Sequence, residues 1–264
     1  MYDLIDIGLN LTASAFSQDL PDVLARAQEA GVRQMVVTGT DIEHSRQAEA
    51  LTRQYPGLLY ATAGVHPHHA KDCNDQTLAQ LELLAKQQGV VAIGECGLDF
   101  NRNFSPRDVQ IQWFEAQLEL ASGLGLPVFL HQRDGHKEFV EILSIWRPRL
   151  INAVAHCFTG GMEQVKSYLD LDLHLGVTGW ICDERRGQDL QQAVQYIPLN
   201  RLMIETDAPY LLPRDLSPKP KDRRNEPRYL PHICEAVAHH RNEEVDDVAQ
   251  QTSQTATNFF GLGQ

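Results

Sequence analysis

The sequence contains no apolar run that approaches the roughly 20 residues needed to cross a bilayer. Its first residues carry neither a basic segment nor a small-residue cleavage site, so we expect no signal peptide there. The 5 cysteines are scattered, odd in number and without a CxxC pair, which favours reduced thiols over disulfides or a zinc knot. Together these absences predict a cytoplasmic protein that makes no membrane contact.

Positive charge is also scarce, because 23 Lys and Arg residues face 35 Asp and Glu residues and the net charge is −12. A protein that binds along duplex DNA normally has the opposite balance. If the substrate is a nucleic acid, the contacts must be local, and a bound cation must offset much of the negative field. The composition therefore favours a small molecule or the end of a nucleic-acid strand as partner.

Short apolar segments alternate with helical patterns along the whole chain, and no linker or low-complexity tract divides it. Strands are expected near residues 4–7, 34–38, 58–63, 90–93, 127–131, 152–156, 173–177 and from 202 onward. Helices are expected near residues 17–30, 41–55, 76–88, 105–124, 135–146, 161–171, 190–196, 230–240 and 244–260. This alternation predicts an α/β fold, a (β/α)8 TIM barrel that spans residues 1–264 as a single domain. An open doubly wound sheet is the rival, but no GxGxxG motif follows a strand.

Local residue types suggest where several of these elements begin and end. The apolar run at 90–93 is expected to stop at Gly94. Asp41 is expected to cap the second helix through its side chain. Ser105 is expected to cap the long helix, with Pro106 in its first turn.

Four of the apolar segments carry a side chain that can bind metal at or just past their C-terminal end, namely Glu95, His131, His156 and Asp207. In a parallel barrel these ends converge on one face, where the side chains could share a metal. The mixed nitrogen and oxygen set suits Mg²⁺, Mn²⁺ or Zn²⁺, and Asp207 could alternatively take a proton from a water molecule. The other interpretation is that these polar residues simply pair with one another, although uncompensated buried charge is costly.

Other side chains near these ends are candidates for substrate contact. His66 could contact a metal ligand or a phosphate, or it could hydrogen-bond to the backbone of its loop. Arg133 and Arg185 could bind phosphate through their guanidinium groups, although Arg133 could equally pair with Asp134. Trp180 could stack on a base or pack at the rim.

At these residues the sequence resembles the TatD family of metal-dependent deoxyribonucleases, which belongs among the amidohydrolase-like barrels. The matching motifs lie at residues 64–68, 94–99, 131–134, 156–160 and 205–211, and two further stretches, 179–187 and 223–227, resemble the bacterial member that gives the family its name. The resemblance implies a (β/α)8 barrel that hydrolyses phosphodiesters with a divalent metal, Mg²⁺ being the expected ion and Mn²⁺ or Zn²⁺ the alternatives. For that bacterial member it implies 3′→5′ exonuclease action on single-stranded DNA and RNA, in DNA repair or RNA decay.

The resemblance assigns Glu95, His131 and His156 as metal ligands, and Asp207 as a ligand or catalytic base. Most family members also place His-x-His after the first strand, where this chain has Gly8 and Asn10. Gly8 cannot ligate a metal and Asn10 offers only a neutral amide oxygen. A second metal is therefore expected to be weak, absent or present only with substrate phosphate.

The sequence thus predicts a monomeric nuclease that acts on the ends of single-stranded DNA or RNA, with Glu95 and Asp207 as catalytic residues. Two alternatives stay open at this point. One is an amide or ester hydrolase of small molecules on the same barrel, although no strand-end lysine suited to carboxylation is evident. The other is a non-catalytic accessory of twin-arginine secretion, which only the family name suggests.

Overall fold

The computed structural model describes residues 3–263, whose strands form one sheet in the order β1-β2-β3-β4-β5-β6-β7-β8. The strands are β1 Leu4–Leu9, β2 Val32–Val37, β3 Leu59–Ala63, β4 Val90–Asp99, β5 Val128–Arg133, β6 Ala153–Ala155, β7 His174–Val177 and β8 Leu202–Ile204. A helical segment follows each strand, and β8 contacts β1. This arrangement is that of a (β/α)8 barrel, which confirms the predicted fold class.

The helices lie close to their predicted positions. They are α1 Leu20–Glu29, α2 Ile42–Gln54, α3 Thr77–Ala85, α4 Arg107–Leu124, α5 His136–Trp146, α6 Met162–Asp170, α7 Gln188–Ala193, α8 Leu230–Arg241 and α9 Val245–Phe260. Asp41 caps α2 as predicted, because its side chain accepts a hydrogen bond from the backbone N–H of His44 at 2.7 Å. The prediction for Ser105 is wrong: Pro106 is the residue before α4, and the Ser105 hydroxyl donates to the backbone oxygen of His68 at 2.9 Å.

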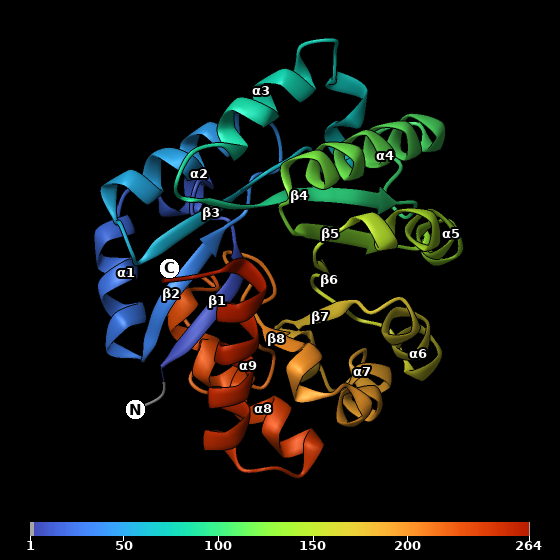
Figure 1. Ribbon diagram of the computed structural model, residues 1–264. Coiled ribbons are helices and arrows are strands. Elements are labelled where there is room, and N and C mark those ends of the chain that lie inside the picture. The colour runs from blue at the N-terminus through green and yellow to red at the C-terminus, as the bar shows by residue number, and fades with distance from the viewer. Residues whose placement is uncertain (1–2, 264) are drawn as a thin grey trace. The chain divides into compact units, whose positions relative to one another are not determined.

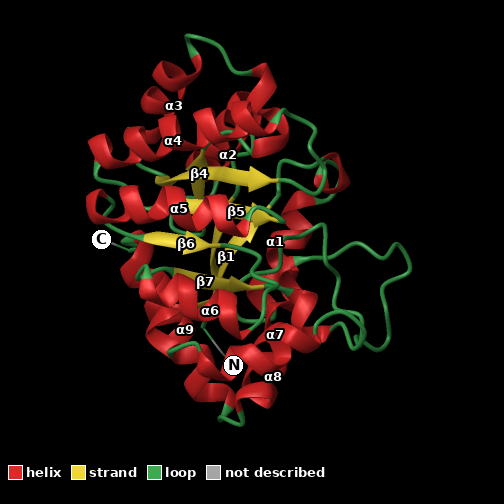
Figure 2. Ribbon diagram, turned by 90° about the vertical axis from the view of Figure 1, so that its right-hand side faces the viewer, coloured by secondary structure: helices red, strands yellow, loops and turns green. Residues whose placement is uncertain are grey.

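The described chain divides into two compact units. The first comprises residues 3–37, 157–166 and 175–263, and the second comprises residues 38–156 and 167–174. Within the first unit β1 pairs with β2 and β7 pairs with β8, both in parallel. Within the second unit β3, β4, β5 and β6 pair in parallel, and Figure 2 shows the arrows of β4, β5 and β6 pointing the same way.

In the second unit, α4 lies along β4 (Figure 1). Phe114 of α4 stacks on Phe139 of α5 with ring centroids 5.6 Å apart, and both side chains are buried. Burying a side chain of this size contributes roughly 1.5–3 kcal/mol relative to leaving it in water. Such contacts hold α4 and α5 together beside β4 and β5, the strands that carry Glu95 and His131.

Strand β4 is longer than the apolar run that predicted it, because it continues through Gly94 to Asp99 with every residue buried. Gly94 and Gly97 have φ values of +136° and +141°, and a Cβ atom at these positions would lie 2.1 Å from the oxygen of Phe129 and 2.0 Å from that of His131. Glycine therefore permits the close approach of β4 to β5. The predicted end at Gly94 is wrong, and Glu95 lies inside the strand.

All five cysteines are free thiols, as the scattered spacing predicted. In the part of the chain that the structure describes, residues 3–263, no helix has the length and apolarity needed to cross a membrane.

Candidate active site

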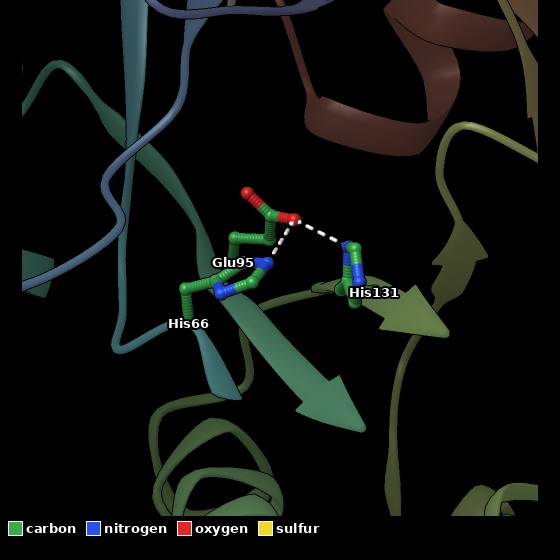
Figure 3. Close-up of side chains that lie close together, drawn as sticks. All are labelled: His66, Glu95 and His131. Carbon is green, nitrogen blue, oxygen red and sulfur yellow. Dashed lines mark ion pairs between the residues drawn. The ribbon is translucent and has the colours of Figure 1, made fainter. Parts of the chain in front are cut away.

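The carboxylate of Glu95 is the point on which three histidines of the second unit converge. Its Oε1 atom lies 2.8 Å from Nε2 of His156, 2.9 Å from Nδ1 of His131 and 3.4 Å from Nε2 of His66. Figure 3 shows the His66 and His131 rings approaching Glu95 from either side. Glu95, His66 and His156 are each less than a tenth exposed. Three histidines from separate segments thus meet around one oxygen atom of Glu95.

Burial alone would raise the pKa of Glu95, but the neighbouring histidines, His156 and His66 foremost, hold it well below its usual range. Burial lowers the pKa of His66 well below that of a free histidine. Although burial also lowers the pKa of His131, its carboxylate neighbours Asp99 and Glu95 raise it overall. The centre therefore holds an ionised carboxylate in a buried setting, which is stable only where positive charge or hydrogen bonds compensate it.

His66 is fixed by its own backbone neighbours. Its Nδ1 atom accepts a hydrogen bond from the backbone N–H of His68 at 3.0 Å, so the neutral ring carries its proton on Nε2, facing Glu95. The backbone N–H of His66 donates to the oxygen of Thr40 at 2.8 Å. The buried side chain of Gln117, on α4, accepts from the N–H of Val65 at 2.7 Å and donates to its oxygen at 3.1 Å. The segment that presents His66 is thereby tied to a helix.

Asp99 is a member of this centre that the sequence interpretation did not single out. Its Oδ2 atom lies 2.6 Å from Nε2 of His68 and 3.5 Å from Nε2 of His131. A usable signal was present, because residues 95, 97 and 99 of an extended strand lie on the same face. That signal was hidden by the expectation that the strand ends at Gly94.

The position of Asp99 is set from the backbone side. The N–H groups of Asn101 and Arg102 donate to its Oδ1 atom at 3.0 and 2.8 Å. The side chain of Gln110, on α4, accepts a hydrogen bond from the backbone N–H of Asp99 at 2.8 Å and donates to the backbone oxygen of Asp99 at 3.1 Å. Although burial raises the pKa of Asp99, hydrogen bonding to His131 and to the N–H of Arg102 lowers it overall, so Asp99 is ionised.

The donor atoms of this centre fit a divalent metal ion. One ligand atom each from His66, Glu95 and His131 lies within 4.8 Å of the other two. The Nε2 atom of His131 is buried and faces the Oδ2 atom of Asp99 at 3.5 Å, which leaves Nδ1 on the side of Glu95. Imidazole nitrogens and a carboxylate oxygen are donors that Zn²⁺ and Mn²⁺ accept readily and that Mg²⁺ accepts in part. His66, which was predicted to contact substrate, thus lies beside the predicted ligands His131 and Glu95, but its Nε2 atom carries a proton and is suited to donate rather than to bind metal.

Asp207 belongs to the first unit, three residues after β8, and has a left-handed backbone with φ of +55°. The side-chain amide of Asn10 donates to its Oδ1 atom at 3.0 Å, and its own N–H donates to the oxygen of Gly8 at 2.9 Å. Gly8 and Asn10 are the positions where most family members are expected to carry histidines. In this chain they hold Asp207 in place by hydrogen bonds.

The aromatic and basic candidates of the first unit lie around Asp183. Trp180 is in a short 3₁₀ segment, Gly179–Cys182, and the guanidinium carbon of Arg186 lies 4.4 Å from its ring centroid. Asp183 is buried, and its carboxylate accepts hydrogen bonds from the backbone N–H groups of Arg185 and Arg186 at 3.0 and 3.2 Å. The side chain of Arg185 is exposed, with its Nε atom 3.8 Å from that carboxylate.

Arg133, in the second unit, is exposed at the end of β5, opposite Asp99 in the strand register. Asp134, which the sequence offered as its possible partner, accepts a hydrogen bond from the side chain of Asn101 at 2.7 Å. A guanidinium group at the end of a barrel strand is well suited to bind phosphate.

Comparisons with known proteins agree with this geometry. A family model described as TatD related DNase matches residues 5–261. Proteins described as 3′-5′ ssDNA/RNA exonuclease TatD from Erwinia amylovora and Pantoea sp. are 53% and 51% identical, in each case covering 98% of this chain and 100% of the relative. The crystal structure of YjjV, a TatD homologue from Escherichia coli K12, has a TM-score of 0.89 at 30% identity and covers 98% of both chains.

Proposed function

This chain belongs to the TatD-related DNase family, and on that premise we propose that it is a divalent-metal-dependent 3′→5′ exonuclease of single-stranded DNA and RNA. The observation that carries this proposal is the convergence of His66, His131 and His156 on one oxygen of the buried Glu95. An interaction scaffold has no need of such a centre, so this observation also weighs against the accessory role in secretion.

We propose that Glu95, His131 and His156 hold the metal, Mg²⁺ being the expected ion and Mn²⁺ or Zn²⁺, which suit the imidazole donors better, the alternatives. His66, whose Nε2 atom carries the proton, is proposed to donate to a substrate phosphate. When bound, the ion would polarise a phosphoryl oxygen and lower the pKa of a water molecule. Asp99 keeps His131 oriented, as outer carboxylates commonly do for metal-bound imidazoles. Three protein donors leave positions on one ion for water and substrate.

Asp207 is proposed to orient the attacking water or to accept its proton. It suits this role because it is a carboxylate that the side-chain amide of Asn10 holds in place. Asn10 and Gly8 do not provide the imidazoles that a second metal would need. We therefore propose that one metal suffices for catalysis, with a second bound weakly or only together with substrate phosphate.

Substrate recognition is assigned to a few side chains. Arg133 and Arg185 are exposed, and their guanidinium groups could donate hydrogen bonds to the phosphates of a strand end. Trp180 offers an aromatic face on which an unpaired base could stack, which would favour single strands over duplexes. The net charge of −12 fits an enzyme that contacts only the end of its substrate. We place this activity in a cytoplasmic monomer.

The test is to strip the protein of metal and add Mg²⁺, Mn²⁺ or Zn²⁺ in turn with 5′-labelled single-stranded DNA and RNA. A ladder that shortens from the 3′ end only with metal supports the proposal. Glu95→Ala should lower the turnover number by at least about 100-fold, whereas Glu82→Ala, at an exposed position of α3, should not. Cleavage without metal, or wild-type turnover by Glu95→Ala, would overturn it.

The remaining alternative function is hydrolysis of a small amide or ester. A D-hydantoinase shares the fold with a TM-score of 0.53, but at 11% identity this likeness shows the fold alone. Incubation of the same metal-loaded samples with a cyclic amide separates the two functions. Turnover of the amide with no shortening of either nucleic acid would show that the protein is a small-molecule hydrolase and not a nuclease.

A further inference from the structure

A second group of possible metal ligands lies in the first unit, formed by Cys182, Asp215 and His232. One ligand atom from each residue lies within 4.8 Å of the other two, and Nε2 of His232 is 2.8 Å from Oδ1 of Asp215. None of the three belongs to the centre around Glu95, and none is needed for the proposed hydrolysis.

The three residues come from segments that are distant in the sequence. Cys182 ends the 3₁₀ segment Gly179–Cys182, Asp215 lies in the irregular stretch between β8 and α8, and His232 lies in the first turn of α8. Cys182 is 5% exposed, whereas Asp215 and His232 are reachable from solvent. A cation could therefore enter from the outside and meet a buried sulfur.

These residues also line a cavity of about 300 Å³. Its wall carries further side chains able to bind metal, which are Glu184, Glu235, His239 and His240. Positions 232, 235, 236 and 239 recur at helical spacing and so share one face of α8. A fourth ligand is thus at hand beside the three that already lie together.

From this arrangement we propose that Cys182, Asp215 and His232 form a metal site separate from the centre around Glu95, and that it is selective for Zn²⁺ or a similar transition-metal ion. Sulfur and imidazole donors favour Zn²⁺, while Mg²⁺ and Ca²⁺ prefer an all-oxygen set. A metal ion at this site would link three segments. These are the end of the 3₁₀ segment, the loop that follows β8, and helix α8. Its role is to stabilise that loop rather than to take part in hydrolysis.

Binding involves one proton. Burial, and then the nearby Asp215, raise the pKa of the Cys182 thiol, so the sulfur is protonated when no metal is present. When the ion binds, the S–H bond breaks, a sulfur–metal bond forms and the proton passes to solvent. No oxidant or reductant takes part.

Cobalt is the probe that distinguishes this site from the centre around Glu95. Co²⁺ bound to a thiolate gives an intense sulfur-to-metal charge-transfer absorption, which a site made of imidazole and carboxylate ligands lacks. Metal-stripped full-length protein should develop this absorption on titration with Co²⁺ and lose it when Zn²⁺ is added. Glu95→Ala should retain it, because it changes only the other centre.

The matched cysteine variants are Cys182→Ser and Cys234→Ser. Cys234 is a buried thiol of α8 that is not among the proposed ligands. Cys182→Ser should abolish the absorption, and Cys234→Ser should keep it. Excess Zn²⁺ should also raise the melting temperature of the wild type by about 5 °C more than that of Cys182→Ser.

Because Cys182 is buried, its replacement could disturb folding, so two further variants are made at solvent-accessible positions. Asp215→Asn and His232→Gln should each weaken Co²⁺ binding by about 10-fold or more while leaving the far-ultraviolet circular dichroism unchanged. No charge-transfer absorption in the wild type at saturating Co²⁺, or its retention in Cys182→Ser, would overturn the proposal. Because the readout is spectroscopic, it is independent of nuclease activity.

Discussion

Gly97 of β4 lies opposite His131 of β5, and no side chain fits between the two backbones there. A Cβ atom at position 97 would be 2.0 Å from the backbone oxygen of His131. The neighbours of Gly97 on the same face of β4, Glu95 and Asp99, supply the carboxylates that face the two ring nitrogens of His131. A glycine in the strand thus permits a histidine to lie between two carboxylates.

Gly97→Ala should therefore impair both folding and activity. The added methyl group would push β5 away, and φ of +141° is strained for alanine, so we expect a loss of about 3 kcal/mol in the free energy of unfolding. Urea denaturation measures this loss. The matched control is Gly123→Ala in α4, where a Cβ meets nothing within 4 Å and should stabilise the helix by about 0.5–1 kcal/mol. An unchanged midpoint for Gly97→Ala would contradict the steric argument.

Asp99→Asn tests the positioning of His131. The amide keeps the size of the carboxylate but removes its charge, so we expect metal affinity to fall by about 10- to 100-fold. The turnover number at saturating metal should recover in part, which separates positioning of a ligand from loss of a ligand. Asp108→Asn, at an exposed position in the first turn of α4, is the control. Equal metal affinity in the two variants would show that Asp99 does not position His131 for metal binding.

A separate cluster in the first unit joins the loop before α8 to α1. Arg224 donates to Asp19 at 2.7 Å and to Glu226 at 2.9 Å, and Arg26 also donates to Glu226 at 2.9 Å. Hydrogen bonding to Arg224 lowers the pKa of Asp19. Burial raises the pKa of Glu226, but Arg26 and Arg224 lower it overall. Carboxyl groups with lowered pKa values stabilise the fold above their unfolded-state pKa, near 4, and lose this effect as the pH falls through the folded-state value.

Arg224→Ala should accordingly cost about 2 kcal/mol at pH 7, because it removes the donor that Asp19 and Glu226 share and leaves each with weaker compensation from Arg26. The difference from the wild type should shrink below about pH 3, where the carboxyl groups become protonated in both proteins. Urea denaturation at both pH values measures the two differences. Lys221→Ala, at an exposed position of the same loop, should change neither. A pH-independent difference would show that Arg224 acts by packing alone.

Trp180→Ala tests whether this ring stacks on a base. Stacking contributes roughly 1–3 kcal/mol per base, so KM for single-stranded DNA should rise by about 5-fold or more while kcat changes little. Trp146→Ala is the control, since Trp146 is also partly exposed and also has an arginine over its ring, Arg149 at 5.2 Å. A similar KM change in both variants would indicate a general loss of stability instead of a lost substrate contact.

Much of the fold and part of the site could be predicted from the order of residues alone. The alternation of apolar and helical segments depends on periodicity, which is local, and it placed the helices within a few residues of their observed bounds. Glu95, His131 and His156 were singled out because they follow or continue apolar strands. Parallel strands bring such ends together, so this inference required no knowledge of individual contacts.

The remaining features depend on which strand residues face each other. The role of Asp99 required that β4 continue past Gly94, which two positive φ values permit and the apolar pattern does not reveal. Likewise, Asn10 reaches Asp207 across 197 positions of sequence, and Cys182 meets His232 through the packing of a 3₁₀ segment against α8. The sequence by itself determined the strands, the helices and the type of chemistry at the strand ends. The tertiary structure decided which side chains touch, because contacts between distant residues depend on strand register and packing, and neither is encoded in local periodicity.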